Sequence, residues 1–320
     1  MNDNIVKCSK LILKIIVILG FILVFSPFGY NILPKMLKAV VIFCLIVIFT
    51  PFGYRILPKV QKVNARDDFI PGAVGSYLIN LPSSKDRYNY VMPNIEKLGY
   101  PVHTIKAVDG YALSDDEVNK IAVGRIKNKK GDIGCALSHF KAYRKFLDSS
   151  YEYALIFEDD VSFNPFVLRG VVEELKGLRQ YWNMVMFDII AGESRYKTLL
   201  KLHSGNDMVL YGKSVYGAGG YLIDRKAAIR YLEKAMPISM PIDLYFTRSW
   251  ELGTKFIGIT NPLLVNQSFG NSDRIAINTK LNSQKLYKVT LSDELERTLI
   301  RIKISIMRRV SFVFWYSKLS

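Results

Sequence analysis

Cysteine is scarce in this chain of 320 residues, which contains only Cys8, Cys44 and Cys135. Two of the three lie in an apolar N-terminal region, and the third stands far from them. This spacing excludes a disulfide framework and offers no cysteine-based metal motif. The cysteine content therefore fits a reducing compartment.

Acidic residues are also few. The chain has 28 Asp and Glu against 44 Lys and Arg, a formal net charge of +16. Residues 1–66 contain nine basic residues and one acid, Asp3, so half of the net charge lies in that segment. A basic chain attracts nucleic acid, an acidic membrane surface or phosphate-bearing substrates. No nucleic-acid recognition motif occurs, so we expect no nucleic-acid partner.

Charges are absent from two long apolar runs near the N-terminus. Lys14–Lys35 and Lys38–Lys59 match each other with an offset of 24 residues. The first run holds 20 consecutive uncharged residues, enough to cross a bilayer core of roughly 30 Å. The 16 uncharged residues between Lys38 and Arg55 are marginal. Basic residues before and after the pair favour a membrane hairpin with both ends in the cytoplasm.

Three alternatives for this duplicated segment stay open. It could form one crossing plus a re-entrant or interfacial segment, a cleaved signal peptide, or a buried hairpin of a soluble core. No small-residue cleavage site follows the first run, and a signal peptide leaves the second copy unexplained. We expect residues 1–66 to anchor the protein in a membrane.

The rest of the chain alternates between strand-like and helix-like segments. A linker over residues 67–73 comes first. Strands are expected at residues 73–81, 101–108, 153–157, 183–190 and 217–223, and helices from about Ser84, at 135–147 and at 225–235. This alternation is typical of an α/β fold with a mainly parallel sheet.

Local signals mark where several of these elements begin and end. Pro93 should interrupt or end the first helix. Residues 124–131 are basic and glycine-containing, which predicts a mobile loop. Helix starts are expected at the capping box Ser114–Glu117, at Asn164-Pro165 and at Asp224.

Three consecutive acids, Glu158, Asp159 and Asp160, follow the apolar strand in "YALIFEDDVSF". In an open α/β sheet, ligands bind at the carboxyl ends of the strands, so these carboxylates should reach that edge. Carboxylate oxygens suit Mg²⁺ or Mn²⁺, which also bind substrate phosphates such as those of a nucleoside diphosphate. The alternative is that Asp159 or Asp160 caps a following turn.

Several motifs occur together in one order. They are "YLINLPSSKDR" (77–87), "AVDG" (107–110), "GDIGCALSHFKAYRKF" (131–146), "LIFEDDVSF" (155–163), "GAGGYLIDRKAA" (217–228) and "PIDLYF" (241–246). Over roughly residues 74–270 the chain resembles glycosyltransferase family 25, the lipopolysaccharide and lipooligosaccharide sugar transferases. The resemblance implies a GT-A-like, Rossmann-type sheet with helices on both faces. It also implies an inverting transfer from a UDP-sugar, often UDP-galactose.

The resemblance also suggests residues that hold the metal and the donor. Glu158, Asp159 and Asp160 are the candidate ligands of Mn²⁺ or Mg²⁺, and the candidate donor-binding residues are Asn80, Arg87, His139 and Asp159. Family members often carry Arg where this chain has Ser83, and Lys85 or Arg87 could supply that charge. The alternatives are a solvated helix face for Arg87, a turn for Asn80 and a hydrogen-bonded core residue for His139.

An inverting transfer needs a general base that deprotonates the acceptor hydroxyl. Asp243, in "MPIDLYF", matches a family Asp and is the first candidate. Asp188, at the end of an apolar strand, is the second. The alternative for Asp243 is an N-cap of the helix that follows. Gln267 and Ser268 are expected near the site by resemblance alone.

The sequence predicts four regions in order. These are a duplicated membrane-anchoring segment (1–66), a linker (67–73), a catalytic domain (74–283) and a basic tail (284–320), where residues 291–313 form an amphipathic helix pattern. We expect a glycosyltransferase at the inner (cytoplasmic) membrane, with its catalytic domain in the cytoplasm and a glycolipid or glycan acceptor. The alternative is a membrane-bound binding or scaffold protein with a degenerate transferase domain.

Overall fold

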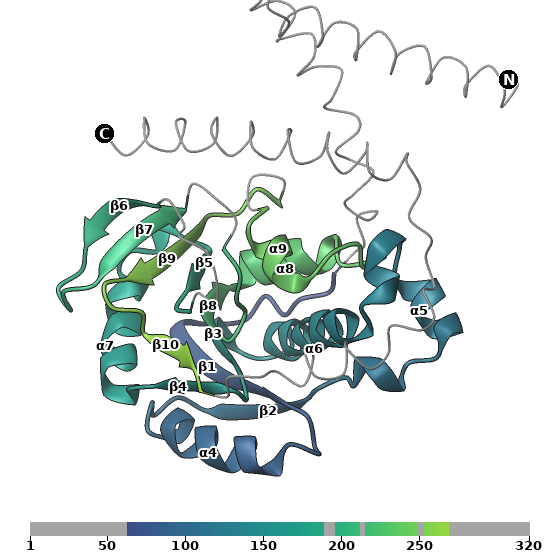
Figure 1. The fold of residues 1–320 in the computed structure, drawn as a ribbon. Helices are drawn as coiled ribbons and strands as arrows, with labels where there is room; N and C mark the ends of the chain where they lie inside the picture. The colour runs from purple at the N-terminus through teal and green to yellow at the C-terminus, as the bar shows by residue number, and fades with distance from the viewer. Residues whose placement is uncertain (1–62, 189–195, 212–214, 249–251, 269–320) are drawn as a thin grey trace, which may run out of the picture. The chain divides into compact units, whose positions relative to one another are not determined.

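The computed structural model describes residues 63–188, 196–211, 215–248 and 252–268 (Figure 1). All of them belong to one compact unit, Leu57–Ser320. The duplicated apolar segment and the amphipathic pattern at residues 291–313 lie outside the described residues. Among the residues that are described, no helix is both long and apolar enough to cross a membrane.

The centre of the fold is an eight-stranded sheet in the order β2-β1-β3-β8-β5-β9-β7-β6. Its strands are β1 (Ile70–Asn80), β2 (Val102–Lys106), β3 (Tyr151–Glu158), β5 (Met184–Met186), β6 (Tyr196–Lys201), β7 (Asp207–Tyr211), β8 (Gly220–Asp224) and β9 (Phe256–Thr260). β1 pairs in parallel with β2 and β3, and β5 pairs in parallel with β9. β8 lies antiparallel between β3 and β5, and β7 lies antiparallel to β9. The expected α/β class is confirmed, although the sheet is mixed.

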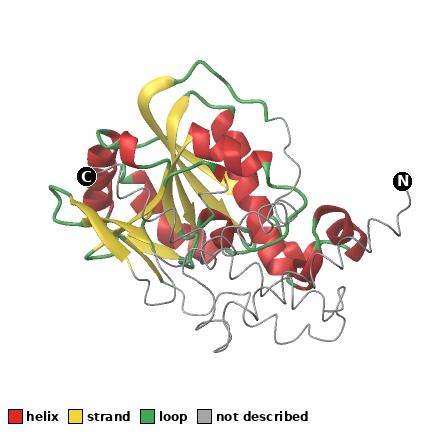
Figure 2. Ribbon diagram, turned by 90° about the horizontal axis from the view of Figure 1, so that it is seen from above, coloured by secondary structure: helices red, strands yellow, loops and turns green. Residues whose placement is uncertain are grey.

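Helices cover both faces of the sheet (Figures 1 and 2). One face packs against α4 (Lys85–Glu96) and α7 (Pro165–Lys176), and the other against α6 (Lys130–Leu147), α8 (Arg225–Glu233) and α9 (Ile242–Phe246). A separate two-stranded ribbon pairs β4 (Val161–Phe163) with β10 (Val265–Gln267). The short helices are α5 (Asp115–Ile121) and the 3₁₀ turns η1 (Gly110–Ala112), η2 (Gly124–Asn128) and η3 (Arg179–Tyr181).

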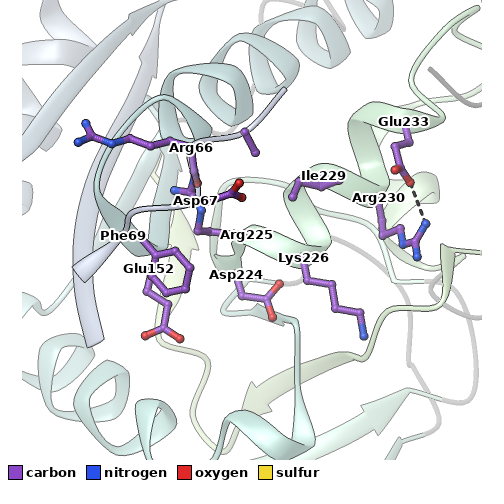
Figure 3. Close-up of a pocket in the computed structure, with 11 residues that line it drawn as sticks. Arg66, Asp67, Phe69, Glu152, Asp224, Arg225, Lys226, Ile229, Arg230 and Glu233 are labelled. Carbon is purple, nitrogen blue, oxygen red and sulfur yellow. Dashed lines mark hydrogen bonds and ion pairs between the residues drawn. The ribbon is translucent and has the colours of Figure 1, made fainter. Parts of the chain in front are cut away.

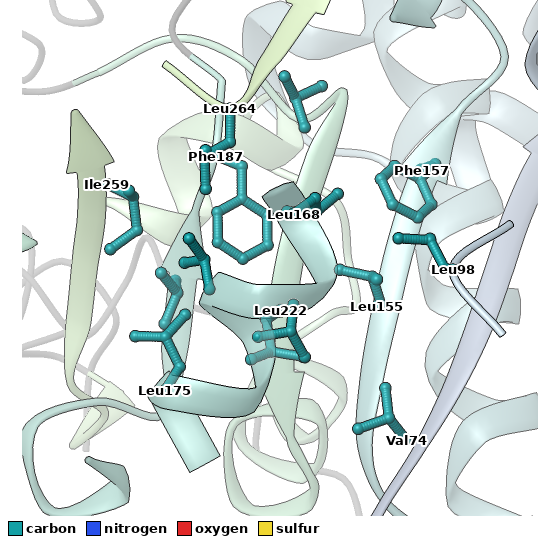
Figure 4. Packing of buried hydrophobic residues seen from close by; sticks show 14 of the residues in the cluster. Val74, Leu98, Leu155, Phe157, Leu168, Leu175, Phe187, Leu222, Ile259 and Leu264 are labelled. Carbon is teal, nitrogen blue, oxygen red and sulfur yellow. The ribbon is translucent and has the colours of Figure 1, made fainter. Parts of the chain in front are cut away.

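The core on the α7 side is built from alternate residues of the central strands. Leu155 and Phe157 of β3 point to the same side as Leu222 of β8, where Leu168 and Leu175 of α7 pack against them (Figure 4). All five side chains are fully buried. Burying one such side chain stabilises the fold by about 1.5–3 kcal/mol. The same alternation turns Ile156 and Glu158 toward the α6 side.

Aromatic rings fill the core on the α6 side. Tyr221 of β8 lies 5.0 Å from Phe246 of α9 and 5.6 Å from His139 of α6, between ring centroids. Tyr143 of α6 stacks on Tyr231 of α8 at 6.1 Å. These contacts hold α6 against the end of β3, which decides where the polar side chains of α6 lie.

Several local predictions are confirmed. The capping box of Ser114 and Glu117 opens α5. Asn164 caps α7 with Pro165 in its first turn, and the Asp224 carboxylate accepts a hydrogen bond from Ala227 N–H at the start of α8. Side-chain oxygens at these positions satisfy N–H groups that a helix start leaves without partners.

Two local predictions are wrong. α4 continues past Pro93 to Glu96, because the carbonyl that Pro93 leaves without a donor belongs to the exposed Asn89 and can bind water. The loop expected over residues 124–131 is instead η2 followed by the first residues of α6. β1 also starts inside the expected linker, at Ile70.

Candidate active site at the carboxyl edge of the sheet

Polar residues at the ends of three strands lie at one edge of the sheet. β1, β3 and β5 are mutually parallel, so Asn80, Glu158 and Asp188 leave the sheet at the same edge. β8 runs the opposite way and therefore begins at this edge, with Gly220 paired to Phe157. The acids after β3 and β5 therefore lie at the edge where the sequence predicts the triplet.

Glu158 faces α6. Its Oε1 lies 3.2 Å from Cys135 Sγ and 3.2 Å from His139 Nε2. The other ring nitrogen of His139 lies 2.7 Å from Tyr221 Oη, which is 2.9 Å from Tyr143 Oη. His139 is fully buried. Both its nitrogens have partners, so His139 orients the Glu158 carboxylate from inside the core.

Asp159 turns the other way, toward β1 and α4. Its carboxylate accepts a hydrogen bond of 2.7 Å from Asn80 Nδ2 and pairs with Arg87 Nη1 at 3.4 Å. Burial raises the pKa of Asp159, while the Asn80 hydrogen bond and the Arg87 charge act in the opposite direction. The structure therefore brings together three of the predicted donor-binding residues. Ser83, at the position where relatives often carry Arg, is exposed.

Asp160 lies under the β4–β10 ribbon and is 4% exposed. Its backbone carbonyl accepts a 2.8 Å hydrogen bond from Ser268 N–H. Gln267 Nε2 lies 3.5 Å from its Oδ2. Gln267 and Ser268, expected near the site by resemblance, are thus beside the acidic triplet.

Asp188 is the most deeply buried acid of the group. Its two oxygens accept hydrogen bonds from the N–H groups of Gly219 at 3.0 Å and Gly220 at 3.3 Å. Burial, with smaller contributions from the negative charges of Glu158 and Asp160, raises the pKa of Asp188 to about 7. A Cβ at Gly219 would meet Asp188 Oδ2 at 3.0 Å and Val161 at 2.8 Å, so glycine is needed there.

Asp243 lies in the first turn of α9 and is half-buried. Pro241 occupies the N-cap position of this helix, so the alternative of Asp243 as N-cap is excluded. Its Oδ1 accepts a 2.7 Å hydrogen bond from Leu244 N–H. The ring of Phe246, on the same helix, lies 6.2 Å from His139. α9 is therefore joined to the acidic triplet through His139.

The arrangement fits a hard divalent cation. Glu158, Asp160 and Asp188 are close enough for the first two charges to raise the pKa of the third. Carboxylate oxygens are the ligands that Mg²⁺ and Mn²⁺ favour, and among these acids Glu158 also contacts the sulfur of Cys135 and the imidazole of His139. Such an ion would offset the mutual repulsion of these charges.

A pocket of about 490 Å³ lies at the opposite edge of the sheet (Figure 3). Glu152, near the start of β3, is among its lining residues, and Glu158 comes six positions later on the same strand, a distance of roughly 20 Å. Arg225 donates hydrogen bonds to five backbone carbonyls, those of Arg66, Phe146, Leu147, Ser149 and Tyr151. Arg225 therefore holds chain segments in place at this edge, and the carboxyl edge remains the candidate active site.

Known proteins share the sequence of this region. The family model described as glycosyltransferase family 25 (LPS biosynthesis protein) matches residues 74–246. The chain belongs to glycosyltransferase family 25. The matched region includes Asn80, the acidic triplet, Asp188 and Asp243. The family assignment drawn from the motifs is confirmed, and with it the enzyme class of a glycosyltransferase.

Curated members of family 25 resemble the same part of the chain. A protein of Aedes aegypti named "Glycosyltransferase 25 family member" is 30% identical over 207 residues, 57% of this chain and 33% of that protein. Procollagen galactosyltransferase 1 of Danio rerio is 24% identical over 184 residues, 52% of this chain and 30% of that protein. Lipooligosaccharide biosynthesis protein lex-1 of Haemophilus influenzae is 26% identical over 207 residues, 58% of this chain and 66% of that protein. The chain spans about a third of the length of the two animal relatives.

One solved structure found by comparison is a Drosophila β1,4-galactosyltransferase 7 mutant in complex with manganese, UDP-Gal and xylobiose. The two chains share 14% sequence identity at a TM-score of 0.34, over 70% of this chain and 79% of that one. This similarity is too weak to indicate a shared fold or function.

Reasoning from the sequence missed two contributors to the site. They are Cys135 and Tyr221, neither of which is among the site residues expected from the sequence. The i, i+4 spacing of Cys135 and His139 does place both on one helix face. However, the contact of this helix face with Glu158 depends on how α6 packs on the sheet.

Proposed function

We propose that this member of family 25 transfers a hexose, with galactose the first candidate, from a UDP-sugar to a lipooligosaccharide, lipopolysaccharide or other glycan acceptor, with inversion. The observation that carries the proposal is the position of Glu158, Asp159, Asp160 and Asp188, which end or follow strands that end at the same carboxyl edge of a family 25 domain. The names of the relatives in Danio rerio and Haemophilus influenzae support the donor sugar and the acceptor class, respectively.

In this proposal the acids at the edge divide the work. Asp160 and Glu158, with Asp159, would hold a divalent cation, and such an ion would supply positive charge to the diphosphate of the departing UDP. Asn80 and Arg87 fix Asp159 on one side of the triplet, and Arg87 also offers a guanidinium to phosphate oxygens.

The acceptor hydroxyl must lose its proton as it attacks the anomeric carbon. Asp243 is our first candidate for the base, because it matches a family acid and lies on the helix that contacts His139. Asp188 is the second candidate, since a pKa of about 7 suits proton transfer near neutral pH. Whichever of Asp243 and Asp188 is not the base would position other groups of the site.

We also propose a GT-A-like fold for the domain and an anchor at the inner (cytoplasmic) membrane through residues 1–66. The support is the mixed sheet with helices on both faces and the duplicated uncharged runs flanked by basic residues. The domain would then face the cytoplasm, where nucleotide sugars are available.

A donor screen tests the proposed function. The full-length protein is incubated with a panel of nucleotide sugars, glycan acceptors and Mn²⁺, and released nucleotide is measured. We expect release with UDP-galactose, and loss of release in Asp160→Asn, which keeps the side-chain shape but removes one charge from the cation site.

The matched control is Asp116→Asn, which removes an exposed carboxylate from the first turn of α5. It should keep full activity. Wild-type protein that releases no nucleotide with any donor and metal would reject transfer. If Asp160→Asn releases nucleotide at a near-normal rate without extra metal, the acidic triplet does not bind a catalytic cation and serves only to cap a turn.

A further inference from the structure

Glu158 belongs to a second cluster, which has a softer chemistry than the acidic triplet. Cys135, His139 and Glu158 each direct one ligand-type atom inward, and these atoms all lie within 4.8 Å of one another. Glu158 Oε1 is 3.2 Å from both the sulfur and the imidazole nitrogen. Within the described part of the chain, no other three His, Cys, Asp or Glu side chains bring their ligand atoms together in this way.

The spacing of these atoms suits a tetrahedral ion. Zinc binds sulfur at about 2.3 Å and imidazole nitrogen or carboxylate oxygen at about 2.0–2.2 Å, which holds its ligand atoms roughly 3.3–3.8 Å apart. The two separations of 3.2 Å are close to that range, and all three atoms lie within 4.8 Å of one another. Cys135 and His139 are one helical turn apart on α6, and Glu158 enters from β3, so two rigid elements form the site.

The surroundings of His139 are those of a metal ligand. Tyr221 Oη, 2.7 Å from Nδ1, can accept the Nδ1 proton and donate its own to Tyr143 Oη. That arrangement leaves the Nε2 lone pair directed at Glu158. Ligating histidines almost always have their second nitrogen held in this way. Cys135 is partly exposed, which gives an ion a route in.

We propose that Cys135, His139 and Glu158 form a site for a thiophilic divalent ion of the zinc class, with a fourth position open to solvent or substrate. On binding, the thiol proton passes to solvent, and the thiolate, imidazole and carboxylate bind the ion. The thiolate and imidazole ligands favour Zn²⁺ or Co²⁺ over Mn²⁺ and Mg²⁺, which prefer the all-oxygen set around Asp160. The site shares Glu158 with the cation site of the proposed transfer activity, and it is tested without donor or acceptor, so its outcome does not depend on that activity.

Cobalt titration of the reduced full-length protein tests the site. Co²⁺ bound to a thiolate gives an intense near-ultraviolet charge-transfer absorption, and tetrahedral Co²⁺ gives strong visible bands. We expect both signals to saturate at one Co²⁺ per chain. One equivalent of Zn²⁺ should abolish them, while the same amount of Mg²⁺ should not.

The variants locate the ion. Cys135→Ser should lose the charge-transfer signal, whereas Cys8→Ser/Cys44→Ser, which removes the other two thiols of the chain, should keep it. Tyr221→Phe removes the hydroxyl that orients His139 and should weaken Zn²⁺ binding by about 10- to 100-fold in calorimetry. Circular dichroism checks that each variant is folded.

Two results would overturn the proposal. The first concerns the charge-transfer signal. The proposal fails if wild-type protein gives no such signal, if Cys135→Ser still gives it, or if the Cys8→Ser/Cys44→Ser double variant loses it. The second concerns Zn²⁺ affinity. The proposal fails if neither Glu158→Gln nor Tyr221→Phe changes the affinity, and this test can be made even if Cys135→Ser does not fold.

Discussion

Glu158 illustrates how much one residue of this site depends on the alternation of a strand. Its neighbour Phe157 is buried on the α7 side, so Glu158 itself faces α6 and meets Cys135 and His139. The two acids after it have left the strand, and Asp159 turns toward Asn80. Adjacent carboxylates therefore have different partners and should respond differently to mutation.

The two candidate bases can be separated by kinetics. Asp243→Asn should slow transfer by about 10²- to 10⁴-fold with little change in UDP affinity, because a base contacts the acceptor and not the diphosphate. Asp188→Asn should lower donor affinity as well as rate, because Asp188 lies beside Glu158 and Asp160. Transfer rates and UDP titrations check both.

The reverse pattern would exchange the two roles. If neither variant slows transfer more than a few fold, both assignments fail.

Asp224 should make stability depend on pH. Burial raises its pKa from 3.8 to about 6, against the opposing hydrogen bonds from Asn183 and Ala227. Between these values the folded protein keeps a proton that the unfolded chain has lost. This proton stabilises the folded protein fully below pH 4, and the stabilisation is lost as the pH rises through 6. The loss lowers the free energy of unfolding by at most about 3 kcal/mol.

Asp224→Asn cannot ionise, so the variant should lose less stability than wild type between pH 4.5 and pH 7.5. Urea denaturation at the two pH values measures the difference. The exposed control Asp116→Asn should follow wild type. A variant whose stability falls as steeply as that of wild type would show that another group is responsible.

At the scale of elements, the position of α6 depends on a close approach between backbones. Gly134, in α6, packs against the η1 turn, where a Cβ would lie 2.5 Å from Gly110 N and 2.6 Å from Val108 O. Ser138, one turn later, accepts a hydrogen bond from Val108 N–H at 2.8 Å. These contacts set the depth at which Cys135 and His139 reach Glu158.

Gly134→Ala should therefore destabilise the protein, by about 1–3 kcal/mol, because backbone atoms must move to make room. A Cβ added at Gly170, within α7, would meet no atom within 4 Å, so Gly170→Ala should stabilise by about 0.5–1 kcal/mol. Chemical denaturation compares the two. Equal effects of the two substitutions would mean that helix propensity, not packing, controls this position.

At the scale of the molecule, the two edges of the sheet have different tasks. The carboxyl edge gathers the acids, while at the other edge Arg225 binds the carbonyl of Arg66, where the chain enters the domain. Arg66 N–H also donates to Leu147 O at 3.1 Å. The entry of the chain is thus fixed roughly 20 Å from the acidic triplet.

Removal of residues 1–62 tests the proposed anchor and spares Arg66. We expect much of the truncated protein in the soluble fraction after cell lysis, with any remainder released by salt because only the basic C-terminal tail would attract it to lipid. Retained circular dichroism is the control for folding. Full-length protein that high salt alone washes from membranes would contradict an anchor.

The sequence by itself determined the family, the α/β class, the helix caps and the arrival of an acidic triplet at a strand end. These follow from local patterns, such as Asn164-Pro165 or an apolar run before Glu158, which act within a few residues. The tertiary structure decided the rest. β8 lies antiparallel in the sheet, which brings Gly219 and Gly220 to Asp188, and the packing of α6 brings Cys135 to Glu158. Such contacts join residues far apart in the chain, so strand order and helix packing fix them, and no local pattern encodes either.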